Sequence, residues 1–284
     1  MPITKQLPMK TLLALLFLIA ASCAAHADER IEEANNIEAL TLAVTRLDAD
    51  LQSRDTAGAQ VFNRAQGPQI EFGYANTRTR AVFGVPGFYT RFELGLGLGR
   101  QNFAGNSTDP ATGAVVANNG PFDVEAADTR SRIGYGWGLG PGGHVVLTPF
   151  IGLAEQLWLR GATMASGTTA YFHNVGEIGL LAQATLSPWI VLGADASVGR
   201  IFGAWQLDQH NMIWPSGRIA SAFSVFLDHR SAADAHERIV LRQSSLRYGD
   251  PAQATGSLEP RRSSAYTVQL EFGTEGKLLE ELFH

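Results

Sequence analysis

The sequence alternates strictly between residues 92 and 99, which read Phe92-Glu93-Leu94-Gly95-Leu96-Gly97-Leu98-Gly99. Every even position in this stretch is large and apolar, and every odd position is glycine or charged. Successive side chains of a β-strand point to opposite faces, so the stretch predicts a strand with one apolar face and one small or polar face. The same alternation recurs in residues 132–139 and 266–272. The chain is therefore predicted to be all-β.

The chemistry of the two faces distinguishes a membrane barrel from a soluble one. In a soluble barrel the apolar side chains point inward and fill a core. Here the second face carries glycine, small polar and charged residues, while the apolar face carries tryptophan and tyrosine near the strand ends. An apolar exterior with aromatic residues at its borders and a polar lumen is typical of a transmembrane β-barrel. No stretch beyond the N-terminal region has the roughly eighteen apolar residues of a transmembrane helix.

Residues 1–27 have the features of a cleaved signal peptide. Lys5 and Lys10 precede an apolar or small run over residues 11–21, and Ala25-His26-Ala27 forms a small-residue cleavage site. Cleavage there leaves Asp28 as the first residue of the mature chain. The alternative is a lipoprotein in which Cys23, the only cysteine, carries the lipid. The run before Cys23 lacks the usual leading leucine, so we favour cleavage after Ala27.

The composition argues against several classes of function. The chain has 22 basic residues, and removing Lys5 and Lys10 leaves 20 against 27 acidic ones. With that balance and no basic run, no nucleic-acid partner is predicted. No group of His, Cys or carboxylate residues has metal-ligand spacing, and the glycine runs lie within strand patterns. We therefore predict neither a metal nor a cofactor.

The links between the predicted strands indicate the topology. Short links at residues 85–87, 140–143 and 187–188 alternate with long polar links at 102–127, 161–169 and 206–216. Outer-membrane barrels have short periplasmic turns and longer external loops, so both termini are predicted to be periplasmic. This parity requires a strand over residues 40–51, although the spacing of its apolar residues is also that of a helix. It also requires a strand near residues 236–248.

These requirements give an antiparallel transmembrane β-barrel of ten strands, with eight as the alternative. We expect a periplasmic segment at residues 28–37, the barrel at residues 38–273, and a periplasmic tail at residues 274–284.

The end of the barrel region carries a recognisable pattern. The alternating residues Tyr266, Val268, Leu270 and Phe272 resemble the β-signal that the barrel-assembly machinery recognises. With the turn phrase Val146-Leu147-Thr148-Pro149-Phe150, they make residues 40–273 similar to the small bacterial outer-membrane β-barrel superfamily. The family usually ends at the aromatic residue, whereas twelve residues follow Phe272 here. The resemblance implies a monomer in the outer membrane, in contact with its lipids and lipopolysaccharide and assembled by that machinery.

Several charged or amide side chains are predicted to point into the lumen. By strand parity these are Glu93, Arg132, Gln156, Arg160, Glu177, Asp195 and Glu271. A barrel of eight to ten strands is narrow enough for side chains to fill it, and charges buried there must be paired. We interpret the set as ion pairs that close the lumen. The alternative is a narrow, porin-like pore whose charges select small solutes.

Two short motifs suggest enzyme activity. Asp208-Gln209-His210 lies in a predicted external loop and is similar to the Asp-x-His pair of omptins, the ten-stranded outer-membrane proteases. An omptin also needs a second acidic pair across the groove, for which this sequence offers only Asp123-Val124-Glu125 or Asp48-Ala49-Asp50.

The second motif, His229-Arg230-Ser231, is similar to the His-x-Ser-Asn run of lipid A 3-O-deacylases, in which the His activates the Ser nucleophile. Ala232 stands at the Asn position, and parity places the run at a periplasmic turn. We therefore predict a non-enzymatic surface barrel that serves surface interaction, adhesion or envelope integrity. The alternatives are an outer-membrane enzyme and a narrow solute channel.

Overall fold

The protein is described by a computed structural model. It describes residues 28–54, 60–82, 85–108, 112, 115–161, 169–208, 211–213, 217–231, 235–249 and 259–275. The predicted signal peptide and most of the predicted C-terminal tail lie outside these ranges. Among the described residues, no helix is long and apolar enough to span a membrane.

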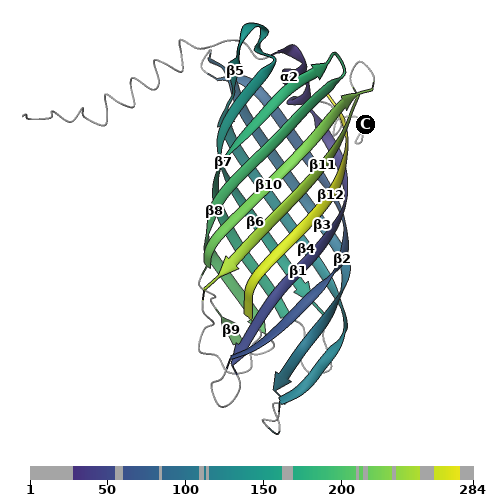
Figure 1. The fold of residues 1–284 in the computed structure, drawn as a ribbon, viewed down its shortest axis with the longest axis vertical. Helices are drawn as coiled ribbons and strands as arrows, with labels where there is room; N and C mark the ends of the chain where they lie inside the picture. The colour runs from purple at the N-terminus through teal and green to yellow at the C-terminus, as the bar shows by residue number, and fades with distance from the viewer. Residues whose placement is uncertain are drawn as a thin grey trace, which may run out of the picture.

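Ten long antiparallel strands close into a barrel (Figure 1). Strand β1 pairs with β2 on one side and with β12 on the other, which closes the sheet. The predicted ten-stranded fold is thus confirmed, and the ambiguous segment 40–51 is a strand. The long strands are β1 (Glu38–Arg54), β2 (Gln60–Val82), β3 (Val85–Thr108), β4 (Val115–Tyr135), β6 (Val145–Arg160), β7 (Thr169–Ser187), β8 (Ile190–Asp208), β10 (Gly217–Arg230), β11 (Ala235–Tyr248) and β12 (Glu259–Thr274). Strands β5 (Trp137–Leu139) and β9 (Asn211–Ile213) are short.

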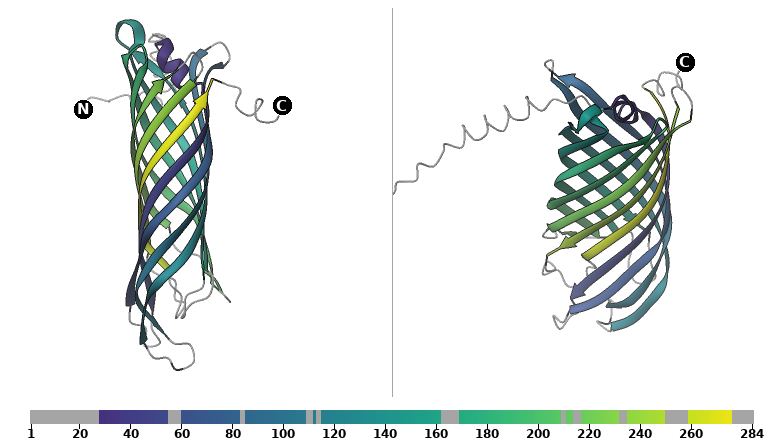
Figure 2. Two further views of the ribbon diagram at one scale, coloured as in Figure 1. Left: turned by 90° about the vertical axis from the view of Figure 1, so that its right-hand side faces the viewer. Right: turned by 45° about the horizontal axis from the view of Figure 1, so that its top comes forward.

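One end of the barrel is marked by helical elements. The helix α2 (Glu29–Ala34) and the 3-10 turn η1 (Pro141–Gly143) lie there, at the end where β12 finishes (Figures 1 and 2). We call this the helix end and the opposite one the loop end. Gly140, Gly142 and Gly143 all have positive φ, which allows the tight turn that leads from β5 into β6.

The outer face carries a continuous band of exposed apolar side chains, here called the apolar belt. Exposed apolar surface of this extent is unfavourable in water and matches the hydrocarbon core of a bilayer. The alternation within each strand produces it, because the intervening residues point into the barrel. The belt includes Leu42, Phe72, Leu96, Leu98, Ile151, Ile178, Val198, Phe223, Leu241 and Val268.

The strands are longer than the membrane requires. Strand β3 has 24 residues, whereas about 9–11 residues cross a bilayer. Residues 102–127, predicted to be a long external link, are mostly paired strand in β3 and β4. The prediction was wrong because the outward residues there are polar or small, so the segment lacks the apolar outer face that identifies a membrane strand. The wall therefore continues beyond the apolar belt as a stem, which reaches furthest from α2 where β3 and β4 pair (Figure 1).

The lumen of this stem is apolar rather than polar. Phe103, Phe122 and Val124 form a buried cluster with Ala49, Leu51 and Ala65. A second cluster contains Leu47, Ala126, Trp158 and Tyr171. Because water bathes the outside of the stem, its apolar side chains pack inward, as in a soluble barrel. The expectation of a polar lumen therefore fails at the loop end.

Candidate functional site

The helix α2 lies in the mouth at the helix end (Figure 2). Ile31 and Ala34 are fully buried and pack against Val146 and Val191 of the wall. Asn35 and Gln183 exchange two amide hydrogen bonds of 2.9 Å each. Two such bonds satisfy both polar ends of each buried amide, so they favour one position of the helix.

The start of α2 is fixed by Asp28. Its carboxylate accepts from the Arg30 amide at 3.0 Å as an N-cap and lies 2.6 Å from Nδ1 of His144. Its own amide donates to the Gly143 carbonyl of η1 at 3.1 Å. Burial alone would raise the pKa of Asp28, but the hydrogen bonds from the Arg30 amide and His144 outweigh it and hold the pKa below its ordinary value.

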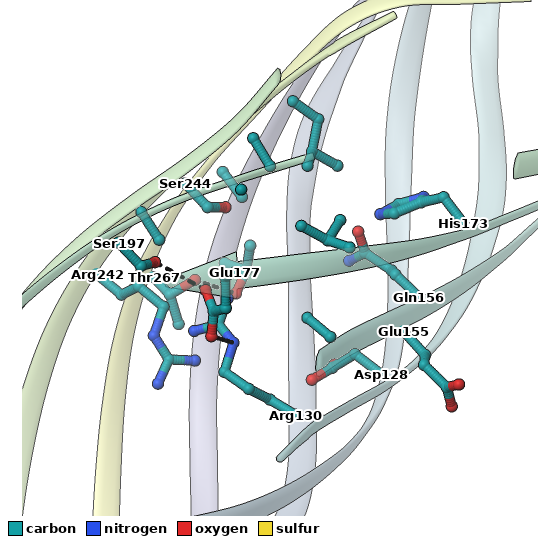
Figure 3. A pocket seen from close by; sticks show the side chains of 18 of the residues that line it. Asp128, Arg130, Glu155, Gln156, His173, Glu177, Ser197, Arg242, Ser244 and Thr267 are labelled. Carbon is teal, nitrogen blue, oxygen red and sulfur yellow. Dashed lines mark hydrogen bonds and ion pairs between the residues drawn. The ribbon is translucent and has the colours of Figure 1, made fainter. Parts of the chain in front are cut away.

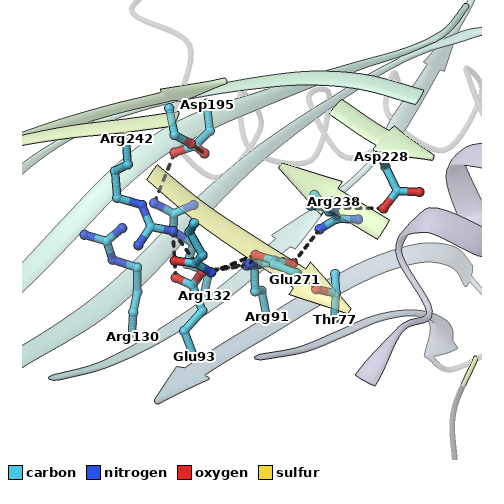
Figure 4. Close-up of polar contacts among 12 residues, drawn as sticks. Thr77, Arg91, Glu93, Arg130, Arg132, Asp195, Asp228, Arg238, Arg242 and Glu271 are labelled. Atoms are coloured by element: carbon cyan, nitrogen blue, oxygen red, sulfur yellow. Dashed lines mark hydrogen bonds and ion pairs between the residues drawn. The ribbon is translucent and has the colours of Figure 1, made fainter. Parts of the chain in front are cut away.

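Deeper in the barrel than α2, a layer of ion pairs crosses the lumen (Figure 4). Arg91 lies between two carboxylates, with Nη2 at 2.7 Å from Glu93 and 2.6 Å from Glu271. Arg238 continues the chain, because it pairs with Glu271 at 3.5 Å and with Asp228 at 2.9 Å. Arg238 also donates to the Ala34 carbonyl at 2.6 Å, which joins the layer to the C-terminal end of α2.

A second branch of the layer centres on Arg132. It lies 3.1 Å from Glu177 and 3.1 Å from Asp195, and all three side chains are at most 8% exposed. Ser197 donates to Glu177 at 2.7 Å, and Ser224 donates to Asp195. Burying these charges is tolerated because every carboxylate has a guanidinium or hydroxyl partner.

The formal charges of the ion-pair layer cancel. It holds five guanidinium groups and five carboxylates: Arg91, Arg130, Arg132, Arg238, Arg242, Glu93, Glu177, Asp195, Asp228 and Glu271. A lumen that selects ions would present an excess of one sign to the permeating solute. The balanced layer is instead suited to closing the barrel.

Aromatic rings support the two central guanidinium groups. Arg132 lies 4.4 Å from the ring centre of Phe150, and Arg238 lies 4.5 Å from that of Phe226. Both rings fit because the neighbouring wall positions are glycine. A Cβ at Gly179 would come within 2.4 Å of Phe150, and one at Gly193 within 2.1 Å of Phe226.

Between the ion-pair layer and the apolar stem lies a polar cavity of about 110 Å³ (Figure 3). His173 and Gln156 line one side, and Arg130 and Arg242 the other. Its volume is sufficient for several water molecules, since each needs roughly 10–15 Å³ of such space. Within the described ranges, no group of three or more His, Cys, Asp or Glu residues could hold a metal ion.

The predicted lumen residues occupy three levels of the barrel. Glu93, Arg132, Glu177, Asp195 and Glu271 meet in the ion-pair layer. Gln156 lines the polar cavity. Arg160 is buried nearer the loop end, with its guanidinium 5.5 Å from the ring centre of Phe122.

The sequence analysis missed five members of the layer: Arg91, Arg130, Asp228, Arg238 and Arg242. Arg91 could have been found, because it shares the inward parity of Glu93 two residues later. Arg238 and Arg242 lie on β11, where the alternation is too weak to distinguish the faces.

The residues considered for an omptin-like site are not assembled in the described part of the chain. Asp208 ends β8, paired with Thr169 of β7, while His210 lies outside the described residues. Asp123 and Glu125 are exposed on the outer face of β4, since Phe122 and Val124 point inward. The pair Asp48 and Asp50 also points outward, and Asp48 binds Arg64 through two contacts of 2.8 and 2.9 Å.

The deacylase-like motif lies at the helix end. The exposed His229 ring is 3.8 Å from Glu237, and the Ser231 hydroxyl donates to the Ala235 carbonyl at 3.5 Å. His229 and Ser231 therefore each contact a different residue rather than one another.

The overall fold resembles solved outer-membrane proteins. The outer membrane protease OmpT from Escherichia coli has a TM-score of 0.54 at 10% identity, over 84% of this chain and 96% of that protein. The translocator domain of the autotransporter NalP from Neisseria meningitidis has a TM-score of 0.42 at 13% identity, over 94% and 95% of the two chains. The toluene transporter TodX from Pseudomonas putida has a TM-score of 0.28 at 8% identity, over 90% and 94%.

No family model and no curated protein sequence matches the chain. At these identities the similarity concerns the fold alone. The chain has the fold of a bacterial outer-membrane β-barrel protein.

Proposed function

We propose that this protein is a closed, non-conducting outer-membrane barrel that acts at the cell surface through its loop end. It contributes to surface interaction, adhesion or envelope integrity without catalysing a reaction. The observation that carries the proposal is the balanced ion-pair layer across the lumen, with Arg132, Glu177 and Asp195 at most 8% exposed.

Closure at three levels argues against a solute channel. The helix α2 fills one mouth, the ion-pair layer crosses the lumen, and the clusters around Phe122 and Trp158 fill the stem. A solute would have to displace buried charges from their partners, which costs several kcal/mol per ion.

The loop end is assigned to the cell exterior. The turns at the helix end are short, as periplasmic turns of such barrels are, and the stem projects from the opposite end. In this orientation both ends of the mature chain are periplasmic. Tyr266, Val268 and Phe272 are exposed on β12, which suits the proposed contact of the β-signal with the assembly machinery.

The outward direction of Asp123 and Glu125 supports a non-enzymatic function. General-base catalysis needs the acidic groups and a histidine within about 3 Å of each other or of one shared water. Side chains on the outer wall of β4 do not face a residue across the barrel mouth.

Two measurements on intact cells and purified protein test the proposal. An epitope inserted between residues 109 and 114 should bind antibody on intact cells, whereas an epitope after residue 284 should require permeabilised cells. The refolded protein should cleave neither dibasic peptides nor lipid A esters, and His210→Ala and His229→Ala should retain the wild-type surface phenotypes. The reverse epitope pattern would contradict the proposed orientation. A cleavage activity that is lost in either variant would contradict the non-enzymatic function and show that the protein is an enzyme.

A further inference from the structure

The outer wall of the stem carries a patch of arginines on five consecutive strands. In sheet order β11, β12, β1, β2 and β3 contribute the exposed side chains of Arg247, Arg262, Arg46, Arg64 and Arg100. We call these five residues the arginine patch. On the next strand, β4, the exposed outward charges are instead acidic, at Asp123 and Glu125. Arg261 of β12, Arg218 of β10 and Arg200 of β8 are exposed as well, so the basic surface extends from β8 to β3 and is interrupted at β4.

The patch begins where the apolar belt ends. Arg46 follows Val44 by two residues on β1, and Arg100 follows Leu98 by two residues on β3. These two arginines therefore lie at the headgroup level of the bilayer. Arg262 is four residues beyond Tyr266 on β12, or roughly 13 Å further along the strand. The patch thus presents positive charge at two depths, at the membrane surface and farther out along the stem.

Two members of the patch are placed against each other. Arg247 and Arg262 are direct partners in the β11–β12 ladder, so their Cβ atoms are about 4.5–5.5 Å apart. Like charges in this position repel and destabilise the pair unless an anion lies between them. The acidic neighbours neutralise the patch only in part. Asp50 on β1 is the ladder partner of both Arg262 and Arg64, and Asp48 is bound by Arg64. On the other side, Asp123 of β4 is the ladder partner of Arg100.

We propose that the arginine patch binds the anionic groups of a lipopolysaccharide molecule in the leaflet at the loop end. Guanidinium groups bind phosphate through paired, charge-assisted hydrogen bonds, and two facing arginines offer several donors to one phosphate. A ligand lying alongside the wall, with its acyl chains on the apolar belt, is placed to reach all five residues. Anionic groups on both its lipid anchor and its adjoining sugars match the two depths, whereas a phospholipid phosphate lies at the lower depth alone.

The proposal rests on the loop end facing the exterior, because lipopolysaccharide occupies the outer leaflet. It does not depend on closure of the lumen. A failure to bind lipopolysaccharide would therefore not contradict the proposal that the barrel is closed. Likewise, a barrel that conducts ions would not contradict the proposed lipid site.

The test measures binding of lipopolysaccharide, lipid A and dephosphorylated lipid A to the refolded full chain in a non-ionic detergent, by native mass spectrometry. The variants are Arg247→Gln with Arg262→Gln, and Arg46→Gln with Arg100→Gln. Arg80→Gln is the matched control, because Arg80 is an exposed outward arginine of β2 near the helix end. We expect each double variant to bind lipopolysaccharide about tenfold more weakly, the loss of roughly one charge-assisted hydrogen bond, while the control binds as the wild type does.

A second readout separates lipid binding from a structural role. Without lipid, the double variant that carries Arg247→Gln and Arg262→Gln should unfold at the same or a higher denaturant concentration than the wild type, because a like-charge pair is removed. Equal lipopolysaccharide affinity in all variants, or equal affinity for dephosphorylated lipid A, overturns the proposal. Full competition by soluble pyrophosphate or heparin also overturns it, since the site would then take soluble polyanions.

Discussion

At the scale of single residues, the lumen charges are stable because each has a partner at the same depth. Arg132 illustrates this, since it joins Glu177 and Asp195 while stacking on Phe150. Alternation around residues 92–99 and 132–139 was enough to predict that Glu93 and Arg132 point inward. It could not predict their partners, because pairing across the lumen depends on the stagger of strands far apart in the sequence.

Replacing Arg132 by alanine should destabilise the fold by about 3–5 kcal/mol, because two buried carboxylates lose their guanidinium. Urea unfolding of the refolded barrel, followed by tryptophan fluorescence, measures this. Arg80→Ala, at an exposed position, should change the free energy of unfolding by no more than about 0.5 kcal/mol. Equal effects of the two substitutions would show that Arg132 is solvated and the layer is not closed.

At the scale of elements, the stem behaves as the core of a soluble barrel joined to a membrane barrel. Alternation with an apolar outer face identified the strands within the belt. Beyond the belt the pattern inverts, with apolar residues inside and polar ones outside, so the same criterion classified residues 102–127 as a loop. The helix α2 was also missed, because its six residues are too few to show a helical period.

The apolar stem predicts a large effect for a buried ring at the loop end. Phe122→Ala should lower the free energy of unfolding by about 3–5 kcal/mol, as expected when a buried aromatic side chain leaves a cavity. Phe72→Ala, on the exposed outer face within the belt, should cost clearly less. If denaturant unfolding gave a negligible change for Phe122→Ala, the stem lumen would be filled with water instead.

Docking of α2 should depend on pH through Asp28. Because its pKa is lowered in the folded state, the contribution of Asp28 is fully present above its ordinary pKa of about 4 and is lost as the pH falls through the lowered value. The protection of the backbone amides of residues 29–36 against hydrogen exchange, measured relative to the intrinsic rate at each pH, should therefore fall below about pH 4.

Asp28→Asn is the control, and its exchange should show a smaller acid response. The remaining response belongs to other carboxylates at this end, such as Glu33, which pairs with Arg230 at 2.7 Å. An acid response of the same size in both proteins would show that Asp28 does not cause the pH dependence of α2 docking.

At the scale of the whole molecule, the fold follows from a division of the wall into two parts with opposite patterns. Sequence periodicity predicted the barrel and its apolar exterior, and the alternation of short and long links predicted its ten strands. The proposed closure depends on three layers contributed by most strands and by α2, and periodicity carries no information about such layers. The central claim is that these layers together leave no path for ions.

Planar-bilayer recording of the refolded protein tests this claim most directly. The wild type should give no steady conductance. A variant that lacks residues 28–37 and carries Arg91→Ala and Arg132→Ala in the ion-pair layer and Phe122→Ala and Trp158→Ala in the stem should show measurable current, provided that it still inserts as a folded barrel on gels. The variant controls for insertion, so silence of the wild type then reports closure. Steady, ohmic current through the wild type, present in every insertion event, would contradict the account and make the protein a channel.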